Sequence, residues 1–299
     1  MSPADYEYLR NLLRQRSGLV LSADKQYLLE SRLLPITRKI GAAGLGELVQ
    51  HLKTSRDEAL IVEIVEAMTT NESFFFRDKL PFDHFRDLVI PKLLEARERE
   101  RRIRIWCAAA STGQEPYSLA MCLSEMGSRL AGWQIEILAT DLSTEVLERA
   151  RSGLYTHFEV QRGLPIQLLI KYFTPLGDRW QIAPQIRCMV DYQPLNLLHD
   201  FARHGRFDVV ICRNVLIYFS PDTKADVLHR LASSTAADGF LMLGAAETVV
   251  GHTDRFRPMP NTRCLYARNN AKPRSHDTGD TGDTVVPFVQ RRTAAVGRA

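Results

Sequence analysis

The sequence predicts an α/β protein in which a mostly parallel sheet follows a small bundle of helices. Two observations carry this prediction. Residues 1–68 place apolar side chains at helical spacing, whereas from residue 103 onward short apolar runs alternate with helix-length segments. Such alternation is typical of parallel strands joined by right-handed crossover helices. With 299 residues and 45% hydrophobic content, the chain can hold one large domain and one small one.

The helical bundle is the first element, and we expect it to span residues 1–68. Its apolar positions recur every three or four residues, first at Tyr6, Leu9, Leu12 and Leu13 and later at Leu60, Ile61, Ile64, Val65 and Met68. Residues 69–102 follow as a linker. The charged end of that linker, 95–102, is typical of a solvated helix terminus.

The sheet domain comes next, at residues 103–267. We expect strands at 103–107, 134–139, 207–212, 240–243 and 263–267, and helices at 114–126, 143–151 and 222–236. The remaining residues, 268–299, are polar and repetitive, and they bury too little apolar surface to order themselves. We predict that this tail is disordered.

More than fifty residues separate the helix at 143–151 from the strand at 207–212, which is too long for a plain crossover. Within this insertion, two short alternating runs at 180–182 and 186–192 flank a connection that contains Pro184. This pattern predicts a small antiparallel hairpin. We interpret the part of the insertion that holds this hairpin, at about 173–195, as a partner-binding subdomain.

The opening strand and the turn behind it indicate what the sheet binds. The strand ends in small residues and Gly113, and a helix begins at Gln114. Small residues let a ligand approach the carboxyl end of a strand, where α/β sheets bind nucleosides. The pyrophosphate fingerprint G-x-G-x-x-G is missing, and the first helical turn holds a carboxylate, Glu115. The pattern therefore favours a cationic or hydroxyl-rich nucleoside and disfavours an NAD-linked oxidoreductase.

Polar residues directly follow two further strands, at the same edge of the predicted sheet. Asp141 closes the second strand, where nucleoside-binding folds place an acid that accepts hydrogen bonds from ribose; a helix N-cap is the alternative interpretation. Arg213 and Asn214 follow the strand at 207–212. An Asn/Asp-Pro-Pro-Tyr sequence is missing there, and this disfavours methylation of a base or amide nitrogen, which needs acceptors for its N–H.

The composition of the chain argues against several other classes of protein. The five cysteines show no C-x-x-C or Cys/His spacing, so we expect reduced core thiols and no metal. A net charge of +4 is too small to imply nucleic acid. No apolar run approaches the ~18 residues of a membrane span, and the N-terminus has no signal-peptide core. We therefore expect a cytoplasmic protein without membrane insertion.

Three segments closely resemble motifs of the CheR-type chemotaxis receptor methyltransferases: 69–77, 108–118 and 212–219. The resemblance spans about residues 1–267. It implies a class I, Rossmann-like methyltransferase domain with a small antiparallel β-subdomain, behind an all-α receptor-recognition domain. It also implies methyl transfer from S-adenosylmethionine to receptor glutamates, with S-adenosylhomocysteine as product and no metal.

The resemblance also implies roles for individual residues. Those expected to contact the cofactor are Asn71, Ser73, Arg77, Glu115, Asp141, Asn196, Leu197, Arg213 and Asn214. Arg77 and Tyr218 are expected to take part in catalysis. Two positions depart from the family pattern: Ser73 stands where threonine is common, and Gln114 where glutamate is common.

Chemoreceptor cytoplasmic helices are the expected partner. Residues 10–39 hold seven basic and two acidic side chains, a balance of +5. A solvated helix face explains this equally well, but a basic face would also steer glutamate-rich receptor helices, and we assign receptor binding to Arg32 and Arg38. The turn within 173–179 is compact, whereas relatives that capture a receptor-tail pentapeptide have a longer, glycine-rich turn. We therefore expect binding without that tail.

Two other functions stay open at the level of the sequence. One is a catalytically silent adaptor that keeps the fold and binds receptors; the other is a methyltransferase that acts on RNA or a small molecule. The intact site residues disfavour the adaptor. RNA binding would show steep salt dependence.

Overall fold

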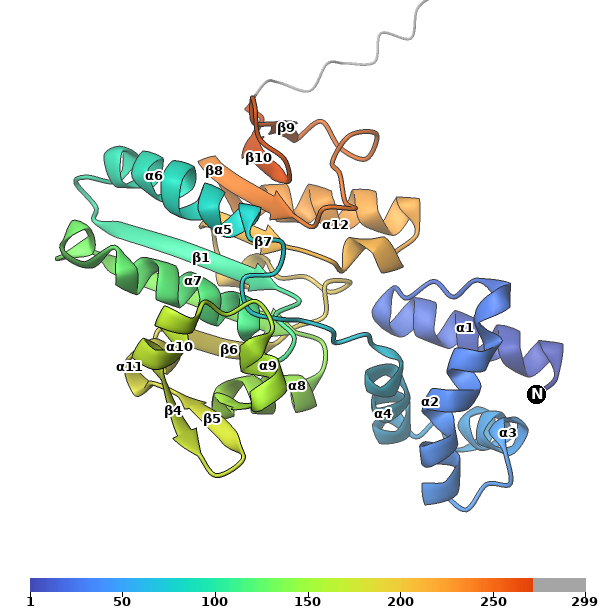
Figure 1. Ribbon diagram of the computed structural model, residues 1–299. Coiled ribbons are helices and arrows are strands. Elements are labelled where there is room, and N and C mark those ends of the chain that lie inside the picture. The colour runs from blue at the N-terminus through green and yellow to red at the C-terminus, as the bar shows by residue number, and fades with distance from the viewer. Residues whose placement is uncertain (271–299) are drawn as a thin grey trace, which may run out of the picture.

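The computed structural model describes residues 1–270 and shows two bodies joined by the segment at 69–79 (Figure 1). The expectation of disorder for the tail falls almost wholly on residues 271–299, which lie outside the described part. The smaller body is a bundle of four helices: α1 (Pro3–Ser17), α2 (Gln26–Lys39), α3 (Leu45–Ser55) and α4 (Glu58–Met68). A 3-10 turn, η1 (Ala23–Lys25), precedes α2. The bundle has a core of its own, made by the apolar positions that recur at helical spacing.

The larger body is built on a seven-stranded sheet in the order β6-β2-β1-β7-β8-β10-β9. The strands are β1 (Arg102–Ala108), β2 (Gln134–Asp141), β6 (Val190–Pro194), β7 (Phe207–Cys212), β8 (Thr235–Leu243), β9 (Phe256–Pro258) and β10 (Leu265–Arg268). The first five in the sheet order pair in parallel, and β10 pairs antiparallel with both β8 and β9. The predicted α/β class is confirmed.

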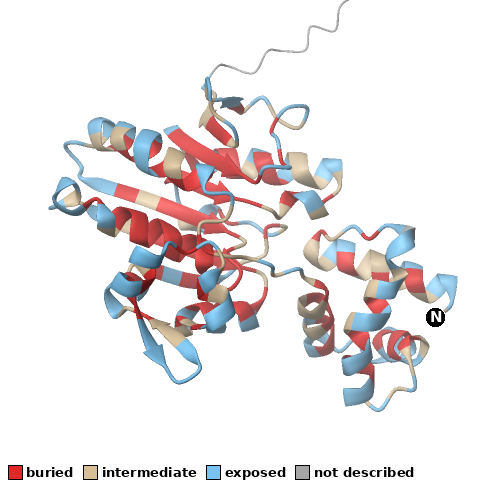
Figure 2. Ribbon diagram, viewed as in Figure 1, coloured by how far each residue is buried: buried red, intermediate tan, exposed pale blue. Residues whose placement is uncertain are grey.

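Helices cover both faces of this sheet. They are α5 (Leu80–His84), a π-turn (Phe85–Val89), α6 (Ile90–Ala96), α7 (Gln114–Glu125), α8 (Thr144–Ser152) and α12 (Pro221–Ser233). Ile105 and Cys107 of β1 belong to the core that includes α6 and α7, whereas Trp106 and Ala108 belong to the core that includes α12. Figure 2 shows α7 as the most completely buried of these helices, and its residues 114–123 are all buried.

A second, three-stranded antiparallel sheet is inserted in the sequence between β2 and β6 of the main sheet. The sequence predicts a small antiparallel unit here, but the strand pairing differs from the prediction. Its order is β3-β5-β4, formed by β3 (Leu154–Thr156), β4 (Phe173–Leu176) and β5 (Arg179–Ile182). Three short helices accompany it: α9 (His157–Gln161), α10 (Ile166–Tyr172) and α11 (Pro184–Arg187).

The predicted hairpin between 180–182 and 186–192 is therefore wrong. Pro184 begins helix α11, and residues 190–194 form β6, which joins the main sheet beside β2. The hairpin partner of β5 is β4, across a two-residue connection at Gly177 and Asp178. Alternation of apolar and polar residues predicts a strand, but it does not predict which strand pairs with it. Proline is as favourable at the first position of a helix as in a turn, so Pro184 did not distinguish the two.

Direct contacts fix the bundle against the carboxyl edge of the main sheet. The Asn196 side-chain amide donates to the Arg16 carbonyl at 2.7 Å, and the Val20 N–H donates to the Tyr218 carbonyl at 2.9 Å. On the other side of the junction, the Glu66 carboxylate accepts the Thr144 N–H at 2.6 Å. The two bodies thus meet where the parallel strands end. No helix among residues 1–270 is long and apolar enough to cross a membrane.

Candidate functional site

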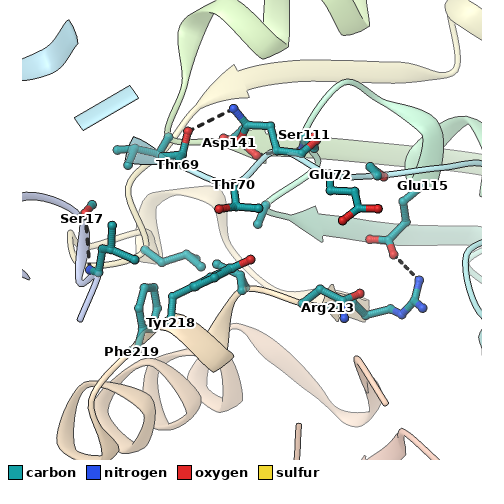
Figure 3. A pocket seen from close by; sticks show the side chains of 18 of the residues that line it. Ser17, Thr69, Thr70, Glu72, Ser111, Glu115, Asp141, Arg213, Tyr218 and Phe219 are labelled. Atoms are coloured by element: carbon teal, nitrogen blue, oxygen red, sulfur yellow. Dashed lines mark hydrogen bonds and ion pairs between the residues drawn. The ribbon is translucent and has the colours of Figure 1, made fainter. Parts of the chain in front are cut away.

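A cavity lies at this junction, between the bundle and the carboxyl edge of the sheet (Figure 3). It holds about 1010 Å³ of empty space, part of it open to solvent. The bundle and the segment behind it contribute Ser17, Leu19, Thr69, Thr70, Asn71, Glu72, Ser73 and Arg77. The sheet edge contributes Ala109, Ser111, Glu115, Asp141, Leu142, Leu195, Asn196, Leu197, Arg213, Asn214, Val215, Tyr218 and Phe219. A concave site with polar and apolar side chains in its lining suits a small-molecule ligand.

The turn after β1 forms the floor of the cavity, and its shape explains why its residues are small. Ala109 and Ser111 have φ values of +63° and +51°, which are uncommon for residues with a Cβ atom. Gly113 has φ +92°, and a Cβ atom there would lie 2.7 Å from the Tyr192 hydroxyl. Strained backbone of this kind is stored at sites where a ligand approaches the chain closely.

Asp141 lies buried at the end of β2, and two backbone groups hold its carboxylate. The N–H of Ser111 donates to Oδ2 at 2.8 Å, and the N–H of Ser143 donates to Oδ1 at 3.0 Å. Burial raises the pKa of Asp141, and the backbone N–H groups oppose that rise. The N-cap of α8 is Ser143, whose hydroxyl accepts the Val146 N–H. The carboxylate of Asp141 is thus left to line the cavity.

Glu115 and Arg213 form a buried ion pair, which Figure 3 shows as a dashed line. Their closest atoms, Oε2 and Nη1, lie 2.6 Å apart, and the Arg213 side chain is only 2% exposed. Nη2 of Arg213 donates to Asp78 at 2.7 Å and to the Arg77 carbonyl at 2.9 Å, while its Nε is buried without a partner. Burial raises the pKa of Glu115, and Arg213 opposes the rise. The charge of Glu115 is therefore matched within the protein, which the sequence did not predict.

The segment at 71–77 lies along one side of the cavity. Ser111 Oγ donates to the Asn71 carbonyl at 2.7 Å, and Arg77 Nη1 donates to the Glu72 carbonyl at 2.8 Å. Phe75 is fully buried, and its ring centroid lies 4.9 Å from that of Tyr155 in the small sheet. The small sheet therefore supports the segment that carries Asn71, Ser73 and Arg77.

The structure brings together every residue to which the sequence assigned a cofactor or catalytic role. The nine expected cofactor contacts and Tyr218 all line this one cavity. The side chain of Asn196, however, is already engaged: it donates to the Arg16 carbonyl and accepts the Leu198 N–H at 2.9 Å. Its amide thus joins the two bodies as well as lining the cavity.

The two arginines assigned to receptor binding lie outside the cavity lining and differ from each other. Arg38 is exposed on α2. Arg32 is half-buried, and its Nη1 donates to the carbonyls of Met68 and Thr69, both at 2.9 Å. Arg32 therefore holds the segment where the bundle meets the cavity.

Sequence analysis missed the contribution of the bundle to the cavity, which comes from Ser17, Leu19, Thr69 and Thr70. It also missed Glu247, a buried carboxylate behind the loop that carries Arg213 and Tyr218. Thr69 and Thr70 lie in the motif at 69–77, but Ser17, Leu19 and Glu247 lie in no motif, so only the tertiary arrangement identifies these three. Within residues 1–270, no group of His, Cys, Asp and Glu side chains could hold a metal ion.

Two family models match the chain. The all-alpha domain of the CheR methyltransferases matches residues 4–69, and the SAM binding domain of the CheR methyltransferases matches residues 71–265. Chemotaxis protein methyltransferase 1 of Pseudomonas aeruginosa is 43% identical over 260 residues, which cover 85% of this chain and 93% of that protein. The chemotaxis protein methyltransferase of Vibrio parahaemolyticus is 40% identical, over 86% of this chain and 93% of that protein. The one from Escherichia coli is 34% identical, over 85% and 87%.

The buried ion pair leads to a prediction about stability. We expect Arg213→Met to lower the free energy of unfolding by about 3–5 kcal/mol, because Glu115 is left charged and buried without a cation. Glu115→Gln should cost less, about 1–2 kcal/mol, because Arg213 keeps Asp78 and the Arg77 carbonyl as partners. Urea denaturation of both variants measures the difference, and equal losses would contradict this account of the pair.

The loss in Arg213→Met should depend on pH. Without the cation, the pKa of Glu115 rises further above its ordinary value of 4.5, so the folded variant binds a proton where the unfolded chain does not. The deficit relative to the unsubstituted protein is full above the raised pKa and shrinks as the pH falls from that pKa toward the ordinary value of 4.5. Denaturation curves at alkaline and at acidic pH check the sign.

Proposed function

The chain belongs to the CheR methyltransferase family, and we propose that it transfers methyl groups from S-adenosylmethionine to glutamate side chains of chemoreceptors, forming glutamyl methyl esters. The observation that carries the proposal is the chemistry of the cavity. Among residues 1–270, its lining holds carboxylates, arginines and a tyrosine but no histidine, cysteine or lysine. A glutamate nucleophile, with an ordinary pKa of ~4.3, is already ionised at neutral pH and needs no general base.

The cavity residues fit S-adenosylmethionine, the cofactor of this family. The Asp141 carboxylate at the end of β2 suits the ribose hydroxyls, as in other nucleoside-binding sheets. Arg77 and Arg213 both line the cavity, and a guanidinium suits an acidic group such as the cofactor's carboxylate. The missing phosphate-binding glycines agree with a ligand that has no phosphate. We propose that Asn71, Ser73, Arg77, Glu115, Asn196, Leu197 and Asn214 complete the binding site.

Catalysis is then a matter of placement. When bound, S-adenosylmethionine supplies an electrophilic methyl group on a sulfonium, which a carboxylate oxygen attacks without any proton transfer. Arg77 donates one N–H to the Glu72 carbonyl and keeps further N–H groups for the incoming carboxylate. Tyr218 lines the same cavity and offers a hydroxyl donor. Opposite charges disappear in this step, so the bundle favours it by keeping bulk water away from the sheet edge.

The basic face of the bundle supports a glutamate-rich helical partner, with Arg38 as its clearest exposed contact. Arg16 pairs with Glu58, and Lys39 pairs with Glu63, so these two cations are partly matched within the bundle. We propose that Arg38 steers the cytoplasmic helices of chemoreceptors toward the cavity. The contacts of Arg32 with the Met68 and Thr69 carbonyls give it a structural task besides any contact with the receptor.

The small sheet supports binding without a receptor-tail peptide. A peptide captured by strand addition needs free N–H groups along an edge strand. β4 is an edge strand of the small sheet, and Pro175 at its centre has no N–H. The connection from β4 to β5, at Gly177 and Asp178, is also too short to clasp a peptide.

The experiment that tests the function uses the purified protein, S-adenosylmethionine labelled in the methyl group, and a cytoplasmic fragment of a chemoreceptor. We expect label on the fragment, and its release as methanol in mild base, because methyl esters hydrolyse there and methylated nitrogen does not. Arg77→Ala should lower turnover by about 100-fold through misplacement of the reacting groups. Its melting temperature should change by only a few degrees.

Several outcomes would contradict the proposal. Base-stable label would mean that the acceptor is not a carboxylate, and label on RNA would favour a nucleic-acid methyltransferase. A protein that binds both the cofactor and the receptor but transfers no methyl group would be an adaptor. Full turnover by Arg77→Ala would remove that residue from the mechanism.

Charge reversal on the bundle tests the receptor-binding surface. Arg38→Glu should raise the KM for the receptor about 3- to 10-fold at low salt, and the effect should fade in high salt. Its cofactor affinity should not change. Arg99→Glu, an equally exposed arginine at the amino edge of the sheet, makes the same change in net charge and should leave the KM as it is. Equal effects of both variants would refute a specific surface. Arg32→Glu should weaken cofactor binding too, because it releases Thr69.

Calorimetry tests independence from the receptor tail. Titration of the protein with a receptor-tail pentapeptide should show no saturable heat up to about 1 mM peptide, which corresponds to less than about 4 kcal/mol of binding free energy. Saturable binding at micromolar concentrations would show that the small sheet captures peptides despite Pro175.

A further inference from the structure

We propose that Glu247 is a positioning residue that holds the loop carrying Arg213, Asn214 and Tyr218 in its cofactor-binding shape. Glu247 follows β8 and is only 8% exposed. It does not line the cavity, and it lies outside the motifs that the sequence singles out. The turnover measurement below rests on the proposed function, whereas the cofactor-binding measurement does not.

The Glu247 carboxylate accepts four backbone N–H groups. Oε2 accepts those of Asn214 and Gly244, both at 2.7 Å, and Oε1 accepts those of Val215 at 3.0 Å and Ile217 at 3.3 Å. Three of the four donors belong to the loop after β7. Hydrogen bonds to an ionised acceptor are about twice as strong as neutral ones, so this carboxylate dominates the shape of the loop.

The loop would not keep this shape by local preference alone. Asn214 has φ +59°, a region that is uncommon for residues other than glycine. Gly244 passes so close that a Cβ atom there would lie 2.8 Å from Asn214 Nδ2 and 2.7 Å from Glu247 Oε2. The backbone directly after β8 therefore approaches both the loop and the Glu247 carboxylate so closely that only glycine fits there.

Three functional groups depend on this loop. The Arg213 side chain reaches Glu115 and Asp78, while Asn214 and Tyr218 line the cavity. The Tyr218 carbonyl also accepts the Val20 N–H from the bundle. A shift of the loop would thus move Arg213 and Asn214, which are proposed to contact the cofactor, together with Tyr218. It would also disturb the contact between Tyr218 and the bundle. Glu247 acts on the reaction through these residues.

Glu247→Gln tests the proposal, because it keeps the length of the side chain but leaves one acceptor oxygen for four N–H groups. The matched control is Asp208→Asn. Asp208 is also 8% exposed and lies near the amino end of β7, the strand that precedes the loop, where it accepts the Arg104 N–H at 2.8 Å and an Arg97 N–H at 2.9 Å. Both substitutions remove acceptors from a buried carboxylate.

We expect both variants to lose several degrees of melting temperature. Glu247→Gln should also weaken S-adenosylhomocysteine binding about tenfold or more in calorimetry and lower kcat with the receptor fragment, because small misplacements are costly at a reacting centre. Asp208→Asn should keep affinity and kcat within about twofold. Glu247→Asp, which keeps both oxygens on a shorter side chain, should fall between the unsubstituted protein and Glu247→Gln.

Unchanged cofactor affinity and kcat in Glu247→Gln would overturn the proposal and leave Glu247 a purely stabilising residue. If Glu247→Gln does not fold, Glu247→Asp decides, and unsubstituted affinity in that variant would overturn the proposal equally. Cofactor binding needs no methyl acceptor. A receptor fragment that accepts no methyl group from the unsubstituted protein would therefore count against the proposed function and leave this comparison intact.

Discussion

The burial of three carboxylates at one edge of the sheet is the constraint on which the rest of the site depends. Asp141, Glu115 and Glu247 end or follow strands β2, β1 and β8, and each is at most 9% exposed. A buried charge is costly unless the protein supplies partners for it. Backbone N–H groups serve Asp141 and Glu247, and a guanidinium serves Glu115. Meeting this requirement fixes the turns after β1 and β7, and these turns line the sheet side of the cavity.

The helical bundle also contacts the carboxyl edge of the main sheet. The turns leave polar groups at the strand ends, and hydrogen bonds join the bundle to them beside apolar contacts such as that of Leu142 with the bundle core. The Arg16 carbonyl meets the Asn196 amide, and the Val20 N–H meets the Tyr218 carbonyl. These contacts fix the bundle over the sheet edge, so that it lines one side of the cavity.

Local patterns predicted most of the fold and the residues at strand ends, because periodicity and strand termini are encoded in short segments. These local patterns predicted that Asp141 and Arg213 lie at the site. They did not predict contacts between segments that lie far apart in the sequence. The pairing of β5 with β4, the contact of Glu115 with Arg213, and the four N–H groups of Glu247 all depend on tertiary packing. Motif resemblance supplied Asn71, Ser73 and Arg77, but it could not show that the side chain of Asn196 also joins the two bodies.

The matched charges bear on how an anionic nucleophile can enter the proposed site. A free, buried Glu115 would attract a cationic cofactor strongly, but it would also repel an incoming glutamate across a medium of low dielectric constant. Because Arg213 pairs with Glu115 and backbone N–H groups bind Asp141, these two carboxylates repel a second carboxylate less than unpaired ones would. Arg77 then adds a positive charge on the side of the linker. Under the proposed function, this arrangement weakens the attraction for a cationic cofactor but lets an anionic acceptor approach it.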